Sequence, residues 1–428
     1  MWIKEIRCWI GIVALCGWGA TLEAQETPKD SMAVILDRYR ILLLHSTTVD
    51  AHSIREFQAT LPQDGRWSDI DYADRAPAGW KTVDHLTRTR ALAAAYAKEG
   101  QPLHGDKELL DSIGRALDHW LARRYRNPNW WNNEIWVPRK MAEIAALIDS
   151  ELKGARRQGV LEIMKASRIK MTGANKMDLA RNVIVRSCLE GDSDSLRKAV
   201  QAIAAEIVVG QSQGIQEDWS FHQHGPCAQT LSYGRVYLMA LSQVGWCLRG
   251  TPYEIPPPQR AMVSRFYLNG IQWMIRKVHT APSTMDRQTN RPDTLSRAAD
   301  FREGLRLWIE ADPDHADALG EFLDRQMGRA PPLVGFRHFP RSDLTVYQRP
   351  GFAFFLKTRS NRVKGTENTN RENLKGLPYL HTGDHYLVVD GSEYTDLPPV
   401  WDWRRLPGLT MHERIGSIEP QSFVGGVG

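Results

Sequence analysis

Nine or ten amphipathic segments of similar length follow one another between about residues 32 and 327, and this series limits the fold more than any other feature. In each segment apolar residues recur at three- and four-residue spacing, which places them on one face of an α-helix. Breakers such as Gly100-Gln101-Pro102 separate the segments. The clearest segments are 83–99, 107–124, 134–152, 176–190, 194–209, 231–248, 258–278, 297–310 and 314–327. Because no sequence repeat accompanies the series, we expect helical hairpins arranged around a ring and not a repeat solenoid.

The pattern of apolar residues changes from helical spacing to short strand-like runs near Ala330-Pro331-Pro332. Three short runs rich in β-branched and aromatic residues follow between turn residues, at 344–347, 352–356 and 386–389. They predict a domain of antiparallel strands over residues 329–428, after a helical domain over residues 25–328. Residues 422–428 read as an unfinished β segment, so we expect this β domain to be incomplete and the chain to be a fragment of a longer protein.

The first 24 residues have the pattern of an export signal. Lys4 and Arg7 form a short basic start, residues 9–20 are an apolar run, and Leu22-Glu23-Ala24 is a suitable cleavage site. The apolar run is shorter than an ordinary membrane span. We therefore expect a secreted or periplasmic protein that has no membrane association once this signal peptide is removed. A buried N-terminal helix is the alternative.

Charge and composition favour some partners over others. The formal net charge of +5 is spread over 55 basic and 50 acidic residues, without the clustered basic stripe of a nucleic-acid-binding protein. Such a mild excess is compatible with an acidic substrate held by a few arginines. The chain has 15 tryptophans, and a flat indole face can stack on a sugar ring. Cysteine spacing matches no metal site, and the mechanism considered below needs neither a metal nor an organic cofactor.

The sequence NWWNNEIWVP, which starts at Asn129, joins the adjacent Trp130 and Trp131 to several amides. Neighbouring residues on a helix point about 100° apart, so both indoles cannot face one core. Asn127-Pro128 just before them predicts a loop that enters a helix. Exposed indoles beside amides suit stacking on sugars together with hydrogen bonds to hydroxyls. The alternative is that the aromatic side chains plug a helix junction.

Two further motifs carry polar side chains close to helix starts. Asn175, in the sequence TGANK, lies at or near an N-cap. There it either caps the helix or turns its amide towards a ligand carboxylate beside the positive helix end. A loop with His222 and His224, ended by a Gly-Pro pair, precedes a helix that bears Tyr233. A metal held by the two histidines is an alternative, although no third ligand is convincingly spaced with them.

Two polar segments complete the set of candidates. Arg287 and Arg291 are four residues apart and could bracket one anion, because a guanidinium fork suits a carboxylate or a sulfate. A solvated charged loop is the alternative. Glu372 and Asn373 lie in a polar turn of the β region, residues 369–376, which a plain hairpin loop would equally explain.

In this order the motifs resemble polysaccharide lyase family 8, which includes chondroitin AC lyase, hyaluronate lyase and xanthan lyase. The matching elements run from about residue 80 to the end: NWWNNEIWVP, TGANK, H-G-P with a tyrosine nine residues after the histidine, R-x-x-x-R-P-D, N-R-E-N-x-K-G, P-V-W-D-W-R-R-L-P-G and S-F-V-G-G-V. None of them is unique alone, but seven in one order are specific. The resemblance implies an incomplete α/α toroid followed by the start of an antiparallel β-sandwich, in a protein that acts outside the cytoplasm.

The resemblance also implies roles for the candidate residues. It places Asn175, His224 and Tyr233 at catalytic positions, and Arg287 at an arginine near the tyrosine. It gives Glu372 the role of a carboxylate that supports this arginine from the β domain. The substrate-binding positions that it implies are Asn129, Trp130, Trp131, Arg291 and Asn373.

The implied activity is that of a carbon–oxygen lyase, which cleaves a uronate-containing polysaccharide by β-elimination. Removal of the C5 proton needs charge stabilisation at the uronate carboxylate, which we expect from Asn175 with His224 or an arginine. Tyr233 is expected to act as general base and then as acid, with Arg287 and His224 favouring its phenolate form. His224 as the base and Tyr233 as the acid is the alternative. Asp286 departs from the family, which often has glycine there, and adds negative charge near the anion site.

Two other functions stay open at this point. An inverting glycoside hydrolase, also common on α/α toroids, would need two carboxylates about 6.5–9.5 Å apart, with Glu134, Glu217 and Asp218 as candidates. A non-catalytic glycan-binding protein is the second alternative. The sequence does not distinguish chondroitin, hyaluronan and xanthan-like polymers. We expect a monomer that binds an acidic polysaccharide and neither nucleic acid nor membrane.

Overall fold

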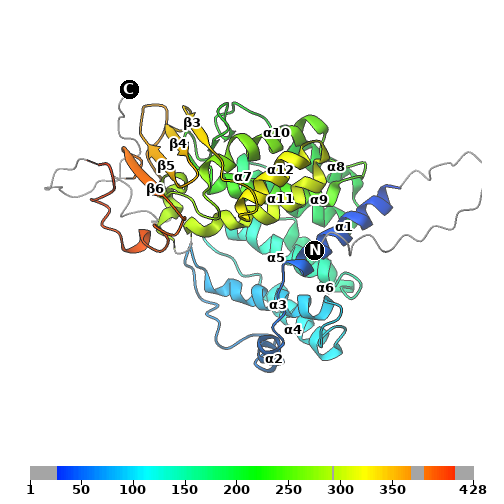
Figure 1. The fold of residues 1–428 in the computed structure, drawn as a ribbon. Coiled ribbons are helices and arrows are strands. Elements are labelled where there is room, and N and C mark those ends of the chain that lie inside the picture. Colours follow the sequence, from blue (N-terminus) through cyan, green and yellow to red (C-terminus); the bar gives the residue numbers. More distant parts are fainter. Residues whose placement is uncertain (1–26, 292–293, 368–379, 410–428) are drawn as a thin grey trace, which may run out of the picture.

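The computed structural model describes residues 27–291, 294–367 and 380–409, and it shows a helical domain followed by one antiparallel sheet (Figure 1). Its helices are α1 (Pro28–His45), α2 (Ala51–Ala59), α3 (Asp84–Ala97), α4 (Lys107–Arg123), α5 (Val137–Leu147), α6 (Gly154–Met164), α7 (Gly173–Glu190), α8 (Ser193–Glu206), α9 (Tyr233–Leu248), α10 (Pro257–Asn269), α11 (Phe301–Ala311) and α12 (Ala316–Gln326). Consecutive helices pack in pairs, as α3 does with α4, α5 with α6, α7 with α8 and α11 with α12. Within the described ranges, every helix is too short or too polar to cross a membrane.

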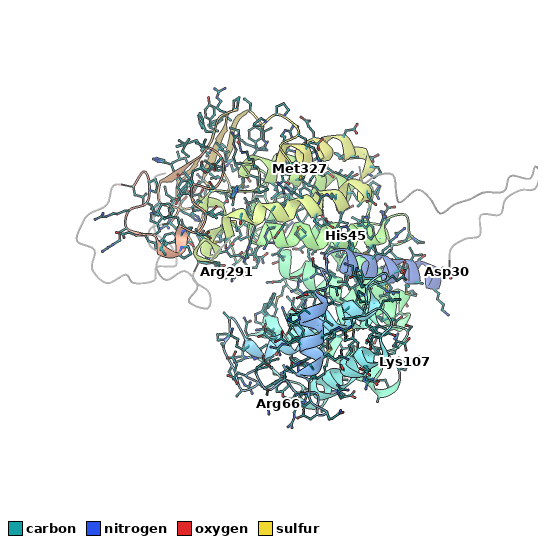
Figure 2. The ribbon with its side chains drawn as sticks, turned by 60° about the horizontal axis from the view of Figure 1, so that its bottom comes forward. Asp30, His45, Arg66, Lys107, Arg291 and Met327 are labelled. Atoms are coloured by element: carbon teal, nitrogen blue, oxygen red, sulfur yellow. The ribbon has the colours of Figure 1, made fainter. Side chains whose placement is uncertain are left out.

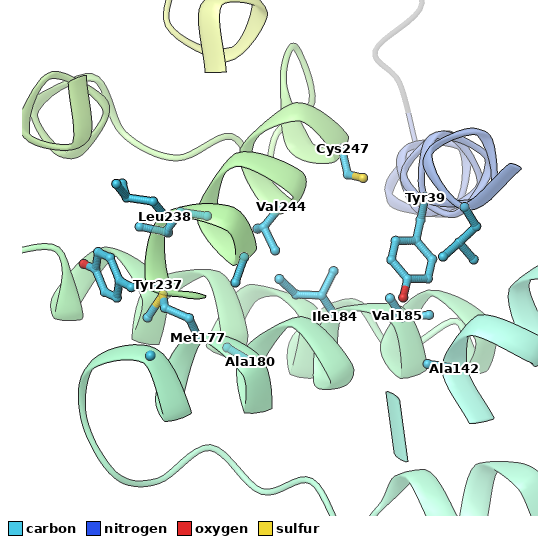
Figure 3. Close-up of a cluster of buried hydrophobic side chains, with 14 of the residues drawn as sticks. Tyr39, Ala142, Met177, Ala180, Ile184, Val185, Tyr237, Leu238, Val244 and Cys247 are labelled. Carbon is cyan, nitrogen blue, oxygen red and sulfur yellow. The ribbon is translucent and has the colours of Figure 1, made fainter. Parts of the chain in front are cut away.

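Helix α7 forms the centre of the helical core. Most of its residues are buried, and it packs against α1, α5, α8 and α9. Figure 3 shows Ala180 and Ile184 of α7 close to Leu238 and Val244 of α9 in one apolar layer. Each fully buried leucine, isoleucine or valine side chain contributes about 1.5–3 kcal/mol. The layer therefore fixes α7 against α9, and with them the two helix starts that carry candidate site residues.

The β part is a four-stranded antiparallel sheet in the order β3-β4-β5-β6. Its strands are β3 (Gly335–Phe339), β4 (Leu344–Gln348), β5 (Ala353–Lys357) and β6 (Asp384–Val388), and a separate pair, β1 (Gly214–Ile215) and β2 (Phe221–His222), lies in the loop between α8 and α9. The register pairs Val346 with Phe355, and Phe355 with Tyr386, so that buried side chains share one face. Exposed side chains, such as Phe336 and Leu387, lie on the other face.

Two polar anchors join the sheet to the helical domain. Arg276 donates to the carbonyl oxygens of Arg349 at 3.0 Å and Pro350 at 2.6 Å. Ser342, which lies between β3 and β4, donates to the hydroxyl oxygen of Ser220 at 2.7 Å. The second anchor ties the sheet to the long loop between α8 and α9. This contact matters for the site, because the same loop carries a predicted catalytic histidine.

The predicted order of a helical domain followed by an antiparallel sheet is confirmed, but some predicted ends are wrong. The segment 258–278 does not stay helical, because α10 ends at Asn269 and a 3₁₀-helix, Ile271–Met274, follows Gly270. A Cβ at Gly270 would lie 2.2 Å from the carbonyl oxygen of Trp219, so only glycine permits this close approach. The segment 297–310 begins as a 3₁₀-helix, Thr294–Asp300, before α11. Helices α1, α2 and α6 and strands β1, β2 and β3 lie outside the segments predicted from the sequence. The predicted signal peptide lies outside the described residues.

Candidate active site

A cleft of about 570 Å³ opens where the first turns of α7 and α9 meet the start of the α5 region and the residues 286–291 and 294–300. The predicted catalytic residues that line it are Asn175, His224, Tyr233 and Arg287. The predicted substrate-binding residues that line it are Asn129, Trp130, Trp131 and Arg291. Figure 2 labels Arg291, which lies on the side of the later helices that faces the N-terminal helices. Glu372 and Asn373 lie outside the described residues.

The loop between α8 and α9 brings His224 to this cleft. The chain turns at His224 and Gly225, whose φ angles are 64° and 85°. A positive φ is unfavourable for a residue with a Cβ and persists only where neighbours hold it. The backbone N–H of His224 donates to Gln213 Oε1 at 2.7 Å, and its carbonyl oxygen accepts from Lys364 Nζ at 3.3 Å. The backbone of His224 is thus held between its own loop and the β part.

A continuous chain of hydrogen bonds links four side chains of the site. His224 Nδ1 donates to the two carboxylate oxygens of Glu367 at 2.8 and 3.0 Å, and Glu367 also accepts from Arg287 Nη1 at 2.6 Å. Arg287 Nη2 donates to the phenol oxygen of Tyr233 at 2.5 Å. The rings of His224 and Tyr233 meet edge to face, with centroids 4.9 Å apart. Because a carboxylate only accepts, we assign a proton to His224 Nδ1, which leaves Nε2 as an acceptor in the neutral ring.

Behind this chain, two carboxylates share one amide group. Gln229 Nε2 donates to Asp286 Oδ2 at 2.7 Å and to Glu367 Oε1 at 3.0 Å. Asp286 is fully buried, and burial, together with the charge of Glu367, raises the pKa of its carboxyl to about 6. Its φ is 49°, a value that glycine adopts without strain. Asp286 does not line the cleft, so its charge acts on Glu367 and Arg287 and not directly on a ligand.

Asn175 is the third residue of α7 and not its cap. The N-cap is Thr172, and the first two N–H groups of the helix donate to the side chains of Glu206 and Gln223. This geometry excludes the alternative that Asn175 merely caps the helix. In the described part of the chain, no hydrogen bond engages the Asn175 amide, which lines the cleft close to the positive end of α7. The amide is therefore placed to bind an anionic group of a ligand.

The two adjacent tryptophans form an aromatic wall of the cleft. Trp130 is 37% exposed, and the guanidinium of Arg139 lies 5.7 Å from the ring centre of the half-buried Trp131. Asn129 Oδ1 accepts from the backbone N–H of Trp131 at 3.1 Å and fixes the entry of the chain. A π-helical turn, Asn132–Trp136, follows before α5, and such turns are frequent at functional sites. The prediction of a loop that enters a helix here is confirmed.

Three guanidinium groups besides that of Arg287 line the cleft. They belong to Arg291, to Arg235 in the first turn of α9, and to Arg297 in the 3₁₀-helix Thr294–Asp300. Arg235 Nη1 forms an ion pair with Asp300 at 2.6 Å. Burial, and then the positive charges of Arg297 and Arg291, lower the pKa of Arg235 against the opposing effect of Asp300. Only Arg291 of these three was singled out from the sequence.

His222 and His224 face different partners. His222 is buried, and its Nε2 lies 3.1 Å from the hydroxyl oxygen of Ser342 in the sheet. Burial lowers the pKa of His222 to about 4, so its ring is neutral at physiological pH. His222 therefore docks the loop onto the sheet, whereas His224 binds Glu367. This divergence does not favour a metal held by the two histidines.

Glu367 belongs to the hydrogen-bonded chain of the candidate site, and it was not among the residues predicted from the sequence. The role of a carboxylate that supports the catalytic arginine was given to Glu372, but in the structure Glu367 makes this contact with Arg287. The segment contains two Glu-Asn pairs five residues apart, Glu367-Asn368 and Glu372-Asn373. Glu372 lies outside the described residues, so its predicted role stays a prediction. The repeated pair is a signal that should have kept both glutamates as candidates.

The carboxylates considered for a hydrolase point elsewhere. Glu134 forms an ion pair with Lys170 at 2.7 Å, and Glu217 forms one with Arg341 at 2.5 Å. Asp218 accepts from the backbone N–H of Arg341 at 2.6 Å. None of these three carboxylates is among the described residues that line the cleft. The one carboxylate among the described residues that line the cleft is that of Asp178, which forms an ion pair with Arg181 at 2.7 Å. The described lining therefore does not offer the two facing carboxylates that a hydrolase needs.

Comparison with known proteins identifies relatives along most of the chain. Residues 43–307 match the family described as polysaccharide lyase family 8, N-terminal alpha-helical domain, and residues 334–428 match its super-sandwich domain. The chain is 30% identical over 386 residues to chondroitinase-AC of Pedobacter heparinus. The match covers 86% of this chain and 55% of that protein. It is 25% identical over 406 residues to xanthan lyase of a Bacillus species, in a match that covers 81% of this chain and 43% of that protein.

Solved structures give the same result. A chondroitinase AC lyase structure, from a study of enzyme–oligosaccharide complexes, matches with a TM-score of 0.85 and 27% identity and covers 93% of this chain and 60% of that one. A Paenibacillus xanthan lyase matches in fold with a TM-score of 0.74 and 22% identity, over 89% of this chain and 42% of that one. The present chain spans about half the length of the curated relatives that it matches. The matches to both domains and the shared fold show that the chain belongs to polysaccharide lyase family 8.

Proposed function

We propose that this chain carries the catalytic part of an enzyme that cleaves an acidic, uronate-containing polysaccharide by β-elimination and leaves a 4,5-unsaturated uronate at the new end. The observation that supports it most is the hydrogen-bonded chain His224–Glu367–Arg287–Tyr233, which reaches the cleft beside the Asn175 amide. The names of the relatives point to the same class, since they are lyases of chondroitin, xanthan and hyaluronate.

The first requirement of this reaction is to neutralise the uronate carboxylate. Loss of the C5 proton places a second negative charge on that group, and the barrier falls when donors already face it. The Asn175 amide suits this task, because it lines the cleft near the positive end of α7 and is not held by another described side chain. The amide would donate to the carboxylate oxygens and stabilise the enolate-like transition state.

The second requirement is a base for the C5 proton. Arg287 stabilises a phenolate on Tyr233, because its Nη2 already donates to the phenol oxygen at 2.5 Å. Glu367 holds the other nitrogen of the fork and keeps the guanidinium in place. In the alternative assignment His224 Nε2 takes the proton, since its Nδ1 proton is directed to Glu367. General base catalysis of this kind contributes about 10²–10⁴ in rate.

The last step breaks the bond between C4 and the bridging oxygen. The electron pair of the C5–H bond forms the C4–C5 double bond as the C4–O bond breaks, and the bridging oxygen leaves with the bonding pair. That oxygen needs a proton, which Tyr233 donates after its own protonation by C5 or as the acid partner of His224. Both assignments use the same cleft residues, and the polymer fragment that leaves carries a new reducing end, the anomeric hydroxyl group of the neighbouring sugar.

We further propose that the protein is exported and acts as a monomer. The basic start at Lys4 and Arg7, the apolar run that follows and the candidate cleavage site at Ala24 support export. A large polymer that cannot enter the cytoplasm would also require an extracellular or periplasmic enzyme. Detection of a mature N-terminus at Gln25 after secretion, by mass spectrometry, tests the first point.

One experiment separates the three candidate functions. The folded chain is incubated with hyaluronan, chondroitin, chondroitin sulfate and xanthan, and ultraviolet absorbance and reducing ends are followed together. A lyase raises both, because each cleavage creates one conjugated unsaturated uronate and one reducing end. A hydrolase raises reducing ends alone, and a binding protein raises neither while it is retained on the immobilised polymer. Reducing ends without absorbance, or retention alone, would contradict the proposal.

A further inference from the structure

We propose that Arg235 and Arg297, beside Arg291, form a second oxyanion subsite in the cleft, which binds a charged group of the polymer other than the carboxylate of the uronate that is cleaved. The proposal rests on the proposed function and specifies which polymers the site takes. Arg235 lies two residues after Tyr233, in the first turn of α9, and Arg297 belongs to the 3₁₀-helix Thr294–Asp300. Both line the same cleft as the catalytic residues.

The chemistry of C5 does not use these two guanidinium groups. Arg287 is the arginine bound to the catalytic phenol, and both of its terminal nitrogens are engaged, one by Glu367 and one by Tyr233. Arg235 and Arg297 have no contact with these partners among the hydrogen bonds of the described residues. A cleft that only removed one proton would not need two more cations along its wall. Their presence indicates a second charged group on the substrate.

The balance of charge in this part of the cleft favours an added anion. Arg235 is paired with Asp300 at 2.6 Å, whereas Arg297, half-buried, forms no ion pair with any residue in the described ranges. Burial lowers the pKa of Arg235 most, and the positive charges of Arg297 and Arg291 lower it further, against the opposing effect of Asp300. Such like-charge repulsion at close range is relieved when an oxyanion binds between the groups.

The ligand chemistry follows from the guanidinium group. Its planar fork pairs with two oxygens of one oxyanion and discriminates poorly between a carboxylate and a sulfate ester. An acidic glycan offers both: the carboxylate of the uronate in the next repeat, or a sulfate on the intervening hexosamine. In either case the subsite binds a charged group that is one sugar or more away from the scissile bond. The indoles of Trp130 and Trp131 offer stacking surfaces in the same cleft.

The test uses Arg297→Gln as the main variant, because it removes the guanidinium without breaking an ion pair to a described residue. Arg235→Gln is the second variant, and thermal unfolding checks that loss of its pair with Asp300 leaves the protein folded. The matched control is Arg197→Gln, which removes an exposed arginine of α8 outside the cleft. Each protein is assayed by ultraviolet absorbance on chondroitin sulfate and on the same polymer after chemical desulfation, at low and high salt.

We expect each cleft variant to lower kcat/KM about tenfold, mainly through KM, with the control unchanged. A loss confined to the sulfated polymer identifies sulfate as the ligand, and an equal loss on both polymers identifies the neighbouring carboxylate. The rise of KM with salt should also be shallower in the variants than in the unaltered chain. Unchanged kcat/KM on both polymers, or a fall in kcat with KM unaffected, overturns the subsite. An unaltered chain that yields no absorbance on any polymer contradicts the proposed function instead, so the two failures are distinguishable.

Discussion

Arg287 donates to the phenol oxygen of Tyr233 at 2.5 Å, and its guanidinium carbon lies 5.3 Å from the centre of the same ring. One cation thus contacts both the oxygen and the ring of a single tyrosine. A hydrogen bond from a charged donor favours the ionised form of the phenol more than the neutral form. In the proposed mechanism, this pair is what allows Tyr233 to accept the proton.

Tyr233→Phe removes the oxygen that both takes and returns the proton. We expect kcat to fall by at least about 10²–10⁴, while the Kd for the polymer changes little, because the phenyl ring still occupies its place beside His224. Ultraviolet absorbance measures the first quantity and binding to immobilised polymer the second. Tyr237→Phe is the matched control one turn further along α9, where the hydroxyl donates to the backbone oxygen of Glu206 at 3.4 Å, away from the cleft. Retained turnover in Tyr233→Phe would remove this residue from the mechanism.

Glu367→Gln tests the residue that the sequence analysis did not find. The amide cannot hold Arg287 and the Nδ1 proton of His224 as a carboxylate does, so both side chains lose their orientation. We expect kcat to fall about 10²-fold. In a double variant with His224→Ala, the losses should be less than additive, because both substitutions disturb one network. Glu217→Gln, at an exposed ion pair, is the control; additive losses would argue against a shared network.

The fold was predictable where local spacing determines it and not where distant residues do. Helices such as α4 and α9 follow from apolar residues at three- and four-residue spacing. β3 gave no such signal, because its residues are half-exposed or exposed up to Phe339. The early end of α10 depends on the close approach of Gly270 to the backbone of Trp219, 51 positions earlier, and no local pattern records that contact.

The site residues also divide into those that local motifs predict and those that only tertiary contacts reveal. Motifs located Asn175, His224, Tyr233 and Arg287 because these residues sit at recognisable helix starts and loops. The carboxylate partner of Arg287 is 80 positions away along the chain, and only tertiary contact decides which of two similar Glu-Asn pairs reaches it. Arg235 and Arg297 were not predicted for a related reason, because the local sequence does not reveal that an arginine on a helix lines a cleft.

Asp286→Asn should change how stability depends on pH. The pKa of Asp286 is raised from 3.8 to about 6 in the folded protein, so the folded state holds the proton more tightly than the unfolded state. The unaltered protein therefore loses free energy of unfolding, relative to the variant, as pH rises from about 4 to about 6, by at most on the order of 3 kcal/mol. The introduced amide oxygen would still accept from Gln229. Denaturant unfolding of both proteins at pH 4.5 and pH 7 measures the difference, with Asp118→Asn as an exposed control.

A stability difference between the unaltered chain and Asp286→Asn that does not vary with pH would contradict this linkage. The comparison isolates Asp286, because Asp384, His222 and the other groups with shifted pKa values are present in both proteins and cancel in the difference. The direction of the effect is informative as well. A carboxylate stabilised by its neighbours would give the opposite slope, with the variant falling behind the unaltered chain as pH rises.

Gly173→Ala tests whether the start of α7 must stay in contact with the histidine loop. A Cβ at Gly173 would lie 2.1 Å from Gln223 Oε1, and the φ of this glycine is +57°. Because Gln223 directly precedes His224 and binds the backbone of Ala174, its displacement would move Asn175 and His224 apart. We expect a loss of about 2–4 kcal/mol in free energy of unfolding, from strain and overpacking together, and a lower kcat/KM. Gly191→Ala, at the other end of the same helix, has a φ of +73° and open space around the added methyl group, so it should cost about 1 kcal/mol and leave kcat/KM unchanged. Equal losses of stability in the two variants, with activity intact in both, would show that backbone strain alone matters and that the contact with Gln223 does not position the site.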